Sequence, residues 1–102
     1  MREYEIYVPL HYNDGVPVPE DKLRRLQAEL VEQFGGLTHF PQENEGLWKV
    51  GSTTFRDQIV ILRVLASDAA AAEKFLARLK EEVKRDWKQE SVLIIARDVE
   101  GI

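Results

Sequence analysis

The sequence predicts an α+β fold with the element order β-α-β-β-α-β, in which a four-stranded antiparallel sheet carries both helices on one face. Three observations support this prediction. Residues 4–12 alternate between the two faces of a strand, residues 19–34 and 69–87 repeat apolar side chains at helical spacing, and residues 55–65 are rich in isoleucine and valine. The length of 102 residues suits a single domain, 1–102, with one hydrophobic core.

The first strand is expected over residues 4–12, where alternate residues share a face. One face would hold Tyr4, Ile6, Val8 and Leu10, and the other Glu5, Tyr7, Pro9 and His11. Because Pro9 cannot donate to a ladder, we expect the strand to bend there or to leave that position unpaired. The asparagine, glycine and prolines of residues 13–19 then predict a turn.

Both helices have recognisable ends. Pro19 suits a first helical position and Gly35-Gly36 stops the apolar pattern, so the first helix is expected at about 19–34. The second helix is expected over 69–87, with Ser67 or Asp68 as its cap. The apolar stripes of the two helices consist of Leu23, Leu26, Leu30, Val31 and Phe34, and of Ala72, Phe75, Leu76, Leu79, Val83 and Trp87.

The other strands lie between and after the helices. Residues 46–50 predict a short strand, 51–54 a turn, and 55–65 the strongest strand of the chain. The stretch that precedes them, 38–46, is expected to be a loop. The last strand is expected over 91–98. This order of elements is that of ferredoxin-like proteins.

The face of the sheet away from the helices should be polar in a chain that stands alone. Here it is apolar in the middle, since it would carry Phe55, Asp57, Ile59, Ile61, Arg63 and Leu65 of the third strand and one row of the fourth, either Leu93, Ile95 and Arg97 or Val92, Ile94 and Ala96. Leaving such side chains in water costs about 1.5–3 kcal/mol for each large apolar group. We therefore expect a second copy, the loop at 37–46 or a ligand to cover this face.

The element order and the two-sided apolar sheet resemble the dimeric α/β-barrel group of ferredoxin-like proteins, which includes small-molecule enzymes and binders. The segments FGGLT (34–38), GLWKVG (46–51) and RDQIVILRV (56–64) also resemble small bacterial proteins of this shape. The resemblance implies a fold and no activity, and it assigns no catalytic residue. With the apolar face, it favours a homodimer or a higher homo-oligomer.

Several classes of function have no support in the sequence. The chain has no cysteine, which excludes disulfides and thiolate chemistry. Its net charge of -4 lacks the basic footprint of nucleic-acid binding. Two histidines without His-x-x-x-His or Glu-x-x-His spacing predict no metal site, and the absence of a glycine-rich phosphate motif predicts no cofactor. Without an export signal or an apolar run of about 20 residues, we expect a cytoplasmic protein and no membrane partner.

A pocket on the open face is one functional interpretation. Its binding residues would be Tyr7, Trp48, Ile59, Ile61 and Arg63. Arg63 would hold an anionic group, and an aromatic ring would stack on the ligand. The candidate catalytic residues are His11, His39 and Asp57, because a histidine beside a carboxylate is the minimal general-base pair. In this interpretation His39 covers the pocket from its loop.

The same residues also have a structural interpretation. Trp48 would pack on an edge strand, the two histidines would be solvated or hydrogen-bonded, and Arg63 would pair with Asp57 or with a carboxylate across a dimer interface. Three functional hypotheses follow. The first is an oligomeric small-molecule-binding or regulatory module that uses the open face, and the second is a small cofactor-free enzyme with a His/carboxylate site there. The third is a nucleic-acid-processing domain in which Tyr7 and Phe55 stack on bases.

Overall fold

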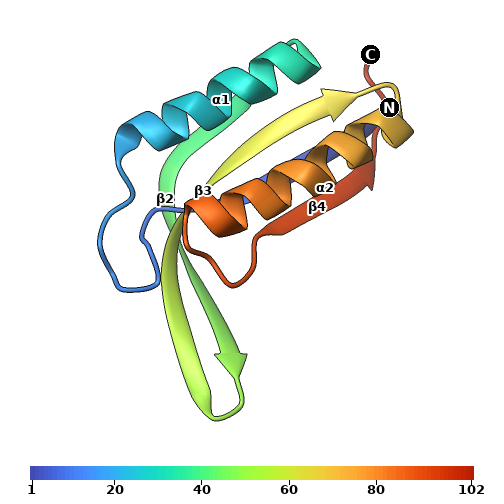
Figure 1. The fold of residues 1–102 in the computed structure, drawn as a ribbon. Helices are drawn as coiled ribbons and strands as arrows, with labels where there is room; N and C mark the ends of the chain where they lie inside the picture. The colour runs from blue at the N-terminus through green and yellow to red at the C-terminus, as the bar shows by residue number, and fades with distance from the viewer.

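In the computed structural model, which describes residues 1–102, the elements follow the predicted order. They are β1 (Arg2–Pro9), α1 (Glu20–Phe34), β2 (Thr38–Val50), β3 (Thr53–Ala66), α2 (Ala69–Asp86) and β4 (Leu93–Asp98). All strand pairs are antiparallel, and the strand order is β2-β3-β1-β4. Both helices cover one face of the sheet and leave the other face open (Figure 1). The predicted ferredoxin-like α+β fold is confirmed.

The core lies between the sheet and the helices. Ile6 of β1 pairs with Leu62 of β3 on one side and with Ile94 of β4 on the other, which fixes the register of the three strands. The helix-facing residues of the strands and the apolar stripes of the helices form one buried cluster. It comprises Tyr4, Ile6, Val8, Leu26, Leu30, Val60, Leu62, Val64, Ala72, Leu76, Leu79, Val83, Trp87 and Val92. Alternation along β1 and β3 therefore predicted the core face correctly.

The helix ends are set by local chemistry. Gly35 adopts a left-handed conformation with φ of 79° and donates its N–H to Val31 O at 2.8 Å, which ends α1. At the start of α2 the side chain of Asp68 accepts the N–H of Ala71 at 3.1 Å. Asp68 is therefore the cap, and Ser67 is not.

The first strand is shorter than predicted, because β1 ends at Pro9 and not at residue 12. Leu10 still donates its N–H to Gln58 O at 2.9 Å, but beyond it only a single bridge joins His11 to Pro17. A proline at the end of the strand loses no ladder bond there.

The prediction of a loop at 38–46 is wrong. These residues belong to β2, which pairs with β3 from Thr38 opposite Arg63 to Val50 opposite Thr53. The register shifts between Phe40 and Asn44, so Pro41 lies in a bulge where it interrupts no ladder bond. The apolar β3 supplies a partner that outweighs the weak strand propensity of β2. Because the segment is part of the sheet, it is not a loop that could fold over the open face.

The ends of β2 and β3 form a long hairpin, residues 44–58, which we call the arm. It closes at Gly51 and Ser52, and Gly51 has a φ of 62° that suits a tight hairpin turn. Figure 1 shows the arm projecting well beyond both helices. No residue of the arm belongs to the core cluster.

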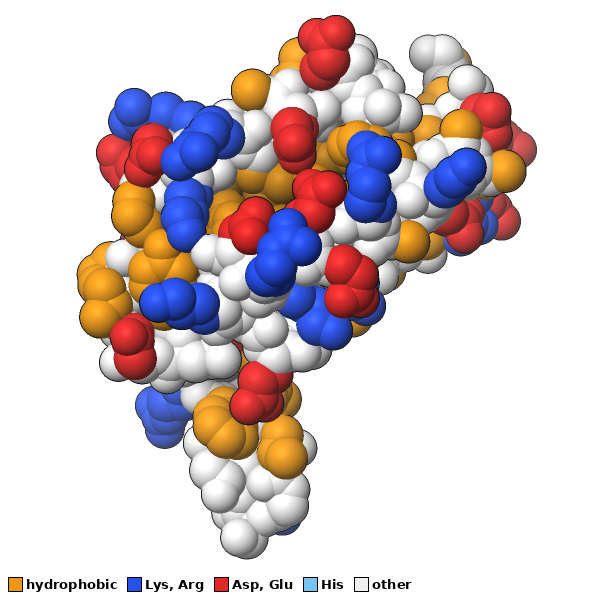
Figure 2. Space-filling model, viewed as in Figure 1, with side chains coloured by type: hydrophobic (Ala, Val, Ile, Leu, Met, Phe, Trp, Pro, Cys, Tyr) orange, Lys and Arg blue, Asp and Glu red, His pale blue; other side chains and the backbone are white.

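The helix side of the molecule is mostly charged. Lysine, arginine and acidic side chains cover α1 and α2, and apolar side chains lie in the hollow between them (Figure 2). This hollow is a groove of about 720 Å³ whose apolar floor includes Leu26, Leu79, Val83 and Trp87. Further apolar side chains are visible on the arm below the helices (Figure 2). No helix is long and apolar enough to cross a membrane.

Candidate functional site

The open face is the side of the sheet opposite the helices. The strand registers place its residues in rows across the sheet: Glu3, Glu5, Tyr7 and Pro9 of β1, Ile59, Ile61, Arg63 and Leu65 of β3, Leu93, Ile95 and Arg97 of β4, and Thr38 and Phe40 of β2. Two kinds of surface meet on it. Four charged side chains lie toward the end of the sheet where β1 begins, and apolar side chains occupy most of the remainder.

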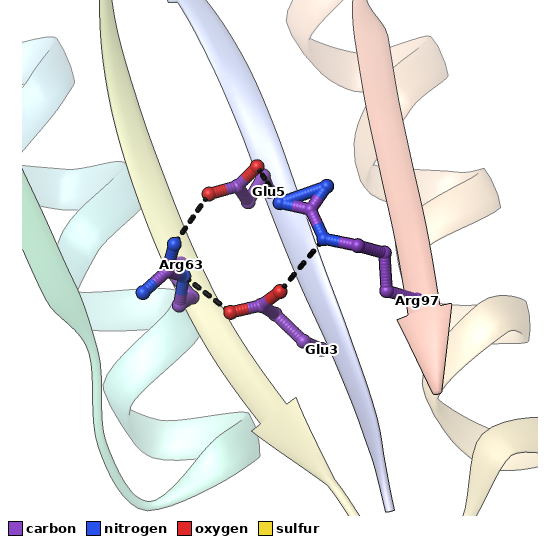
Figure 3. Close-up of polar contacts among 4 residues, drawn as sticks. All are labelled: Glu3, Glu5, Arg63 and Arg97. Carbon is purple, nitrogen blue, oxygen red and sulfur yellow. Dashed lines mark hydrogen bonds and ion pairs between the residues drawn. The ribbon is translucent and has the colours of Figure 1, made fainter. Parts of the chain in front are cut away.

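The four charged residues form a closed ring of ion pairs (Figure 3). Arg63 approaches Glu3 with its Nε at 2.5 Å and donates from Nη2 to Glu5 at 2.8 Å. From the other side, Arg97 donates from Nε to Glu3 at 3.1 Å and from Nη2 to Glu5 at 2.5 Å. Each carboxylate of β1 therefore contacts one guanidinium from β3 and one from β4. We call this cluster the ion-pair ring.

The ion-pair ring is neutral and partly withdrawn from water. Only 9% of the Glu5 side chain and 12% of the Glu3 side chain are exposed, whereas 34% of Arg63 and 48% of Arg97 are exposed. Nε of Arg63 is buried and has no hydrogen bond, so its contact with Glu3 is an ion pair without hydrogen-bond geometry. Because the charges cancel, covering the ring with an apolar surface would bury no net charge.

Apolar side chains surround the ion-pair ring. The guanidinium carbon of Arg63 lies 4.8 Å from the centroid of the Phe40 ring, a cation–π contact. Leu65 and Leu93 are 49% and 53% exposed on the same face. Tyr7 lies between Ile61 and Leu93 in adjacent strands. The face thus combines aromatic, aliphatic and paired charged groups on one surface.

The structure brings together three of the predicted binding residues, namely Tyr7, Ile61 and Arg63. Ile59 lies on the same face but is only 7% exposed, between Pro9 of β1 and Asn44 of β2. Covering Ile59 therefore needs no second molecule, contrary to the expectation from the sequence. The prediction that Arg63 pairs with Asp57 is also wrong, because the partners of Arg63 within the chain are Glu3 and Glu5.

Trp48 and Asp57 do not join these residues, because both lie on the arm. Trp48 pairs with Phe55 and Asp57 with Gly46. Phe55 is six residues along β3 from Ile61, which corresponds to about 20 Å at the usual rise of a strand. The same distance separates Phe55 from the row of Tyr7, so the two aromatic residues proposed to stack on bases do not form one platform.

The two histidines lie away from the open face. His39 pairs with Leu62, whose side chain is in the core, so His39 is on the helix side of the sheet and does not cover the open face. His11 and His39 both line a cavity of about 390 Å³, together with Glu20 and Glu43. All four prolines of the chain, Pro9, Pro17, Pro19 and Pro41, line it as well. The predicted placement of His39 over the open face is therefore wrong. Asp57 does not line this cavity, and the carboxylates that share it with the two histidines are those of Glu20 and Glu43.

Glu3, Glu5, Arg97 and Phe40 are site residues that the sequence interpretation did not select. The available signal was the matched alternation of charge, with two acids at positions 3 and 5 on one strand and a single arginine on each neighbouring strand. No group of three or more histidine, aspartate or glutamate side chains is placed to hold a metal ion.

Comparison with known proteins shows the fold and no family. No protein-family model matches the chain, and no match was found among curated proteins. A phage SAM lyase solved in complex with S-methyl-5'-thioadenosine is similar, with a TM-score of 0.72 and 14% sequence identity over 95% of this chain and 80% of that chain. A phage SAM lyase in its apo state gives a TM-score of 0.70 and 17% identity over 94% of this chain and 78% of that chain.

A third similar structure is a point variant of CutA1 from Pyrococcus horikoshii OT3. Its TM-score is 0.64 and its identity 13%, over 100% of this chain and 86% of that chain. At these identities the likeness is one of fold alone. It agrees with the ferredoxin-like arrangement derived from the sequence, and it assigns no activity to any residue of this chain.

Proposed function

We propose that this chain is a small-molecule-binding or regulatory module that self-associates through its open face as a homodimer or a higher homo-oligomer. The observation that carries the proposal is a neutral ion-pair ring within an apolar surface that no helix or loop of the chain covers. Leu65 and Leu93 are about half exposed on this surface. Contiguous apolar patches of this kind mark interfaces or ligand sites.

The ligand would lie on the open face beside the ion-pair ring. Arg63 and Arg97 each use Nε and Nη2 on the carboxylates, which leaves Nη1 of both to meet a polar group of a ligand. Tyr7 and Phe40 offer aromatic surface beside them. A small molecule that combines an aromatic ring with polar groups suits these residues. S-methyl-5'-thioadenosine, which is bound in the structurally similar phage SAM lyase, combines these features and supplies a first compound to test.

Light scattering at a series of concentrations tests the self-association. Leu93→Lys places a charge on the open face and is expected to lower the molar mass of the assembly to that of a single chain. The matched control is Val31→Lys, because Val31 is similarly exposed but lies on α1, on the other side of the sheet. A wild-type chain that remains monomeric at all concentrations would contradict the proposal, and so would an equal effect of the two substitutions.

Calorimetry with S-methyl-5'-thioadenosine tests the ligand site. We expect saturable binding that is weakened by Tyr7→Ala and unchanged by Tyr12→Ala, since Tyr12 lies outside the sheet in the connection between β1 and α1. Binding that responds equally to both substitutions, or that is absent, would argue against a nucleoside site on the open face.

A second candidate function is a small cofactor-free enzyme, and it is favoured by the cavity that His11 and His39 share with Glu20 and Glu43. In this candidate a histidine acts as general base and a glutamate orients its ring. Incubation with SAM, followed by chromatography for S-methyl-5'-thioadenosine, is the first assay. Turnover should fall in His11→Asn and His39→Asn and persist in Asp57→Asn, because Asp57 lies on the arm. If neither His11→Asn nor His39→Asn changed the turnover, the cavity would not be the active site.

A further inference from the structure

We propose that the arm of each chain lies across the open face of a second copy of the same chain. This inference rests on the proposed self-association and names the element that carries it out. Four large apolar side chains of the arm are exposed: Leu47 at 58%, Trp48 at 45%, Val50 at 59% and Phe55 at 45%. A two-stranded ribbon is at best marginally stable by itself in water, so an arm of this composition needs a partner.

Three of these side chains are on the same side of the sheet as the open face. Phe55 precedes Ile59 and Ile61 by even numbers of residues along β3, so its side chain shares their face. Trp48 is directly opposite Phe55, and Val50 is two residues further along β2. The ring of Trp48 also lies over Gly46, where an added Cβ would approach Cζ3 at 3.2 Å. Leu47 points to the opposite side of the arm.

Trp48, Val50 and Phe55 of the arm and the open face lie on the same side of the sheet. This arrangement favours a second copy of the chain as the molecule that covers them. Two chains that turn their open faces toward each other also present the Trp48 side of each arm to the other chain. The exchange is reciprocal, so the open face and the Trp48 side of the arm both find a partner within a closed, symmetric assembly. The surfaces are also compatible in charge. Asp57 is the only charged residue on the Trp48 side of the arm, and the ion-pair ring is neutral.

The size of the open face gives a second reason to include the arm. Three strands about 4.8 Å apart and about 25 Å long have a projected area of about 350 Å². Stable specific interfaces bury about 800 Å² on each partner, so the open face alone supplies less than half of that area. The arm, two strands over about 20 Å, adds about 200 Å². Face and arm together therefore supply about 550 Å², or about two-thirds of that area, compared with less than half from the face alone.

The test compares two substitutions on opposite sides of the same arm in the full-length chain. We expect Trp48→Ser to weaken self-association at least about tenfold, measured as the shift in the concentration at which the molar mass changes. Leu47→Ser, at a similarly exposed apolar position on the other side, is the matched control and should shift it less than about twofold. Circular dichroism of both variants checks that the fold is retained.

The outcomes separate this inference from the function on which it rests. If the wild-type chain never associates, both fail. If it associates and Leu93→Lys disrupts the assembly while Trp48→Ser does not, the open face is the interface but the arm does not cover it. Equal losses from Trp48→Ser and Leu47→Ser would also overturn the proposed placement, because only the Trp48 side shares the open face.

Quenching of tryptophan fluorescence by acrylamide gives an independent readout. The chain has two tryptophans, and Trp87 is only 5% exposed in the single chain, so the accessible emission comes from Trp48. We expect this emission to become protected as the protein concentration rises through the association range. Emission that stays accessible in the assembly would overturn the inference. Protection that needs added phosphatidylcholine vesicles would overturn it as well, because the occupant would then be a lipid surface.

Discussion

Glu5 of β1 accepts a hydrogen bond from Nη2 of Arg63 at 2.8 Å, although the two residues are 58 positions apart in the chain. The same carboxylate accepts from Arg97 of β4, so one nearly buried acid joins three strands. The ion-pair ring is thus a structural element of the sheet as well as the polar part of the candidate site.

Replacing Arg63 tests how much the ion-pair ring stabilises the sheet. In Arg63→Met both glutamates lose one of their two cations, and the free energy of unfolding is expected to fall by about 1–3 kcal/mol. The partial exposure of Arg63 and the remaining contacts of Arg97 keep the loss in this range. Urea titration at neutral pH measures it.

The control for this prediction is Arg56→Met on the arm. Arg56 also contacts a glutamate, Glu45 at 3.3 Å, but its side chain is 77% exposed. Its removal should change the free energy of unfolding by less than about 0.5 kcal/mol. Equal effects of the two substitutions would mean that the closed geometry of the ring adds no stability.

The raised pKa of Tyr4 predicts that the protein loses stability at alkaline pH. Burial raises the pKa of Tyr4, and its hydrogen bond to Glu73 at 2.9 Å raises it further. The folded state therefore holds this proton more tightly than the unfolded chain does. The resulting stability is fully present below the unfolded pKa near 10 and is lost as the pH rises through the folded pKa.

The Tyr4→Phe variant isolates this contribution. At pH 8 the wild type is expected to be more stable by about 0.5–1.5 kcal/mol, the usual value of one hydrogen bond. That advantage should shrink when unfolding is measured above pH 10, since only the wild type loses a proton from this position. A difference that stays constant between pH 8 and pH 11 would contradict this account of Tyr4.

The fold could be derived from the sequence because its strongest signals are local. Alternation along β1 and β3 and the apolar stripes of the helices depend only on neighbouring residues, and they identified the core face. The extent of β2 could not be derived in this way. Residues 38–46 of β2 include Pro41, Asn44 and Gly46, which favour turns, and only the pairing with β3 makes this segment a strand.

The residues of the candidate site could not all be predicted, because the register of β2 against β3 was not known from the sequence. Because β2 begins at Thr38, His39 pairs with Leu62 and is on the helix side, one residue away from Phe40, which contacts Arg63 on the open face. A shift by one residue exchanges the two faces of a strand. Tyr7, Ile61 and Arg63 were placed correctly because they are on strands whose alternation is unambiguous.

Asp68 is predicted to be the residue that anchors the start of α2. Its side chain accepts the N–H of Ala71, so Asp68→Ala leaves that donor without its partner in the chain. The free energy of unfolding should fall by about 1 kcal/mol. Ser67→Ala is the control and should be neutral within about 0.5 kcal/mol, because Ser67 is exposed and makes no capping bond. If urea unfolding showed a larger loss of stability for Ser67→Ala than for Asp68→Ala, Ser67 would be the capping residue.

Gly35 and Gly36 offer a matched pair for the end of α1. Gly35 has a φ of 79°, whereas Gly36 has no positive φ, and a Cβ added at either position would meet no atom within 4 Å. Any difference between their alanine variants therefore comes from the backbone. Gly35→Ala is expected to lower the free energy of unfolding by about 1–2 kcal/mol, the cost of a left-handed conformation for an L-residue. Gly36→Ala should be neutral or slightly stabilising, because alanine reduces the conformational freedom of the unfolded chain. Equal effects in urea unfolding would show that the left-handed conformation of Gly35 is not what ends the helix.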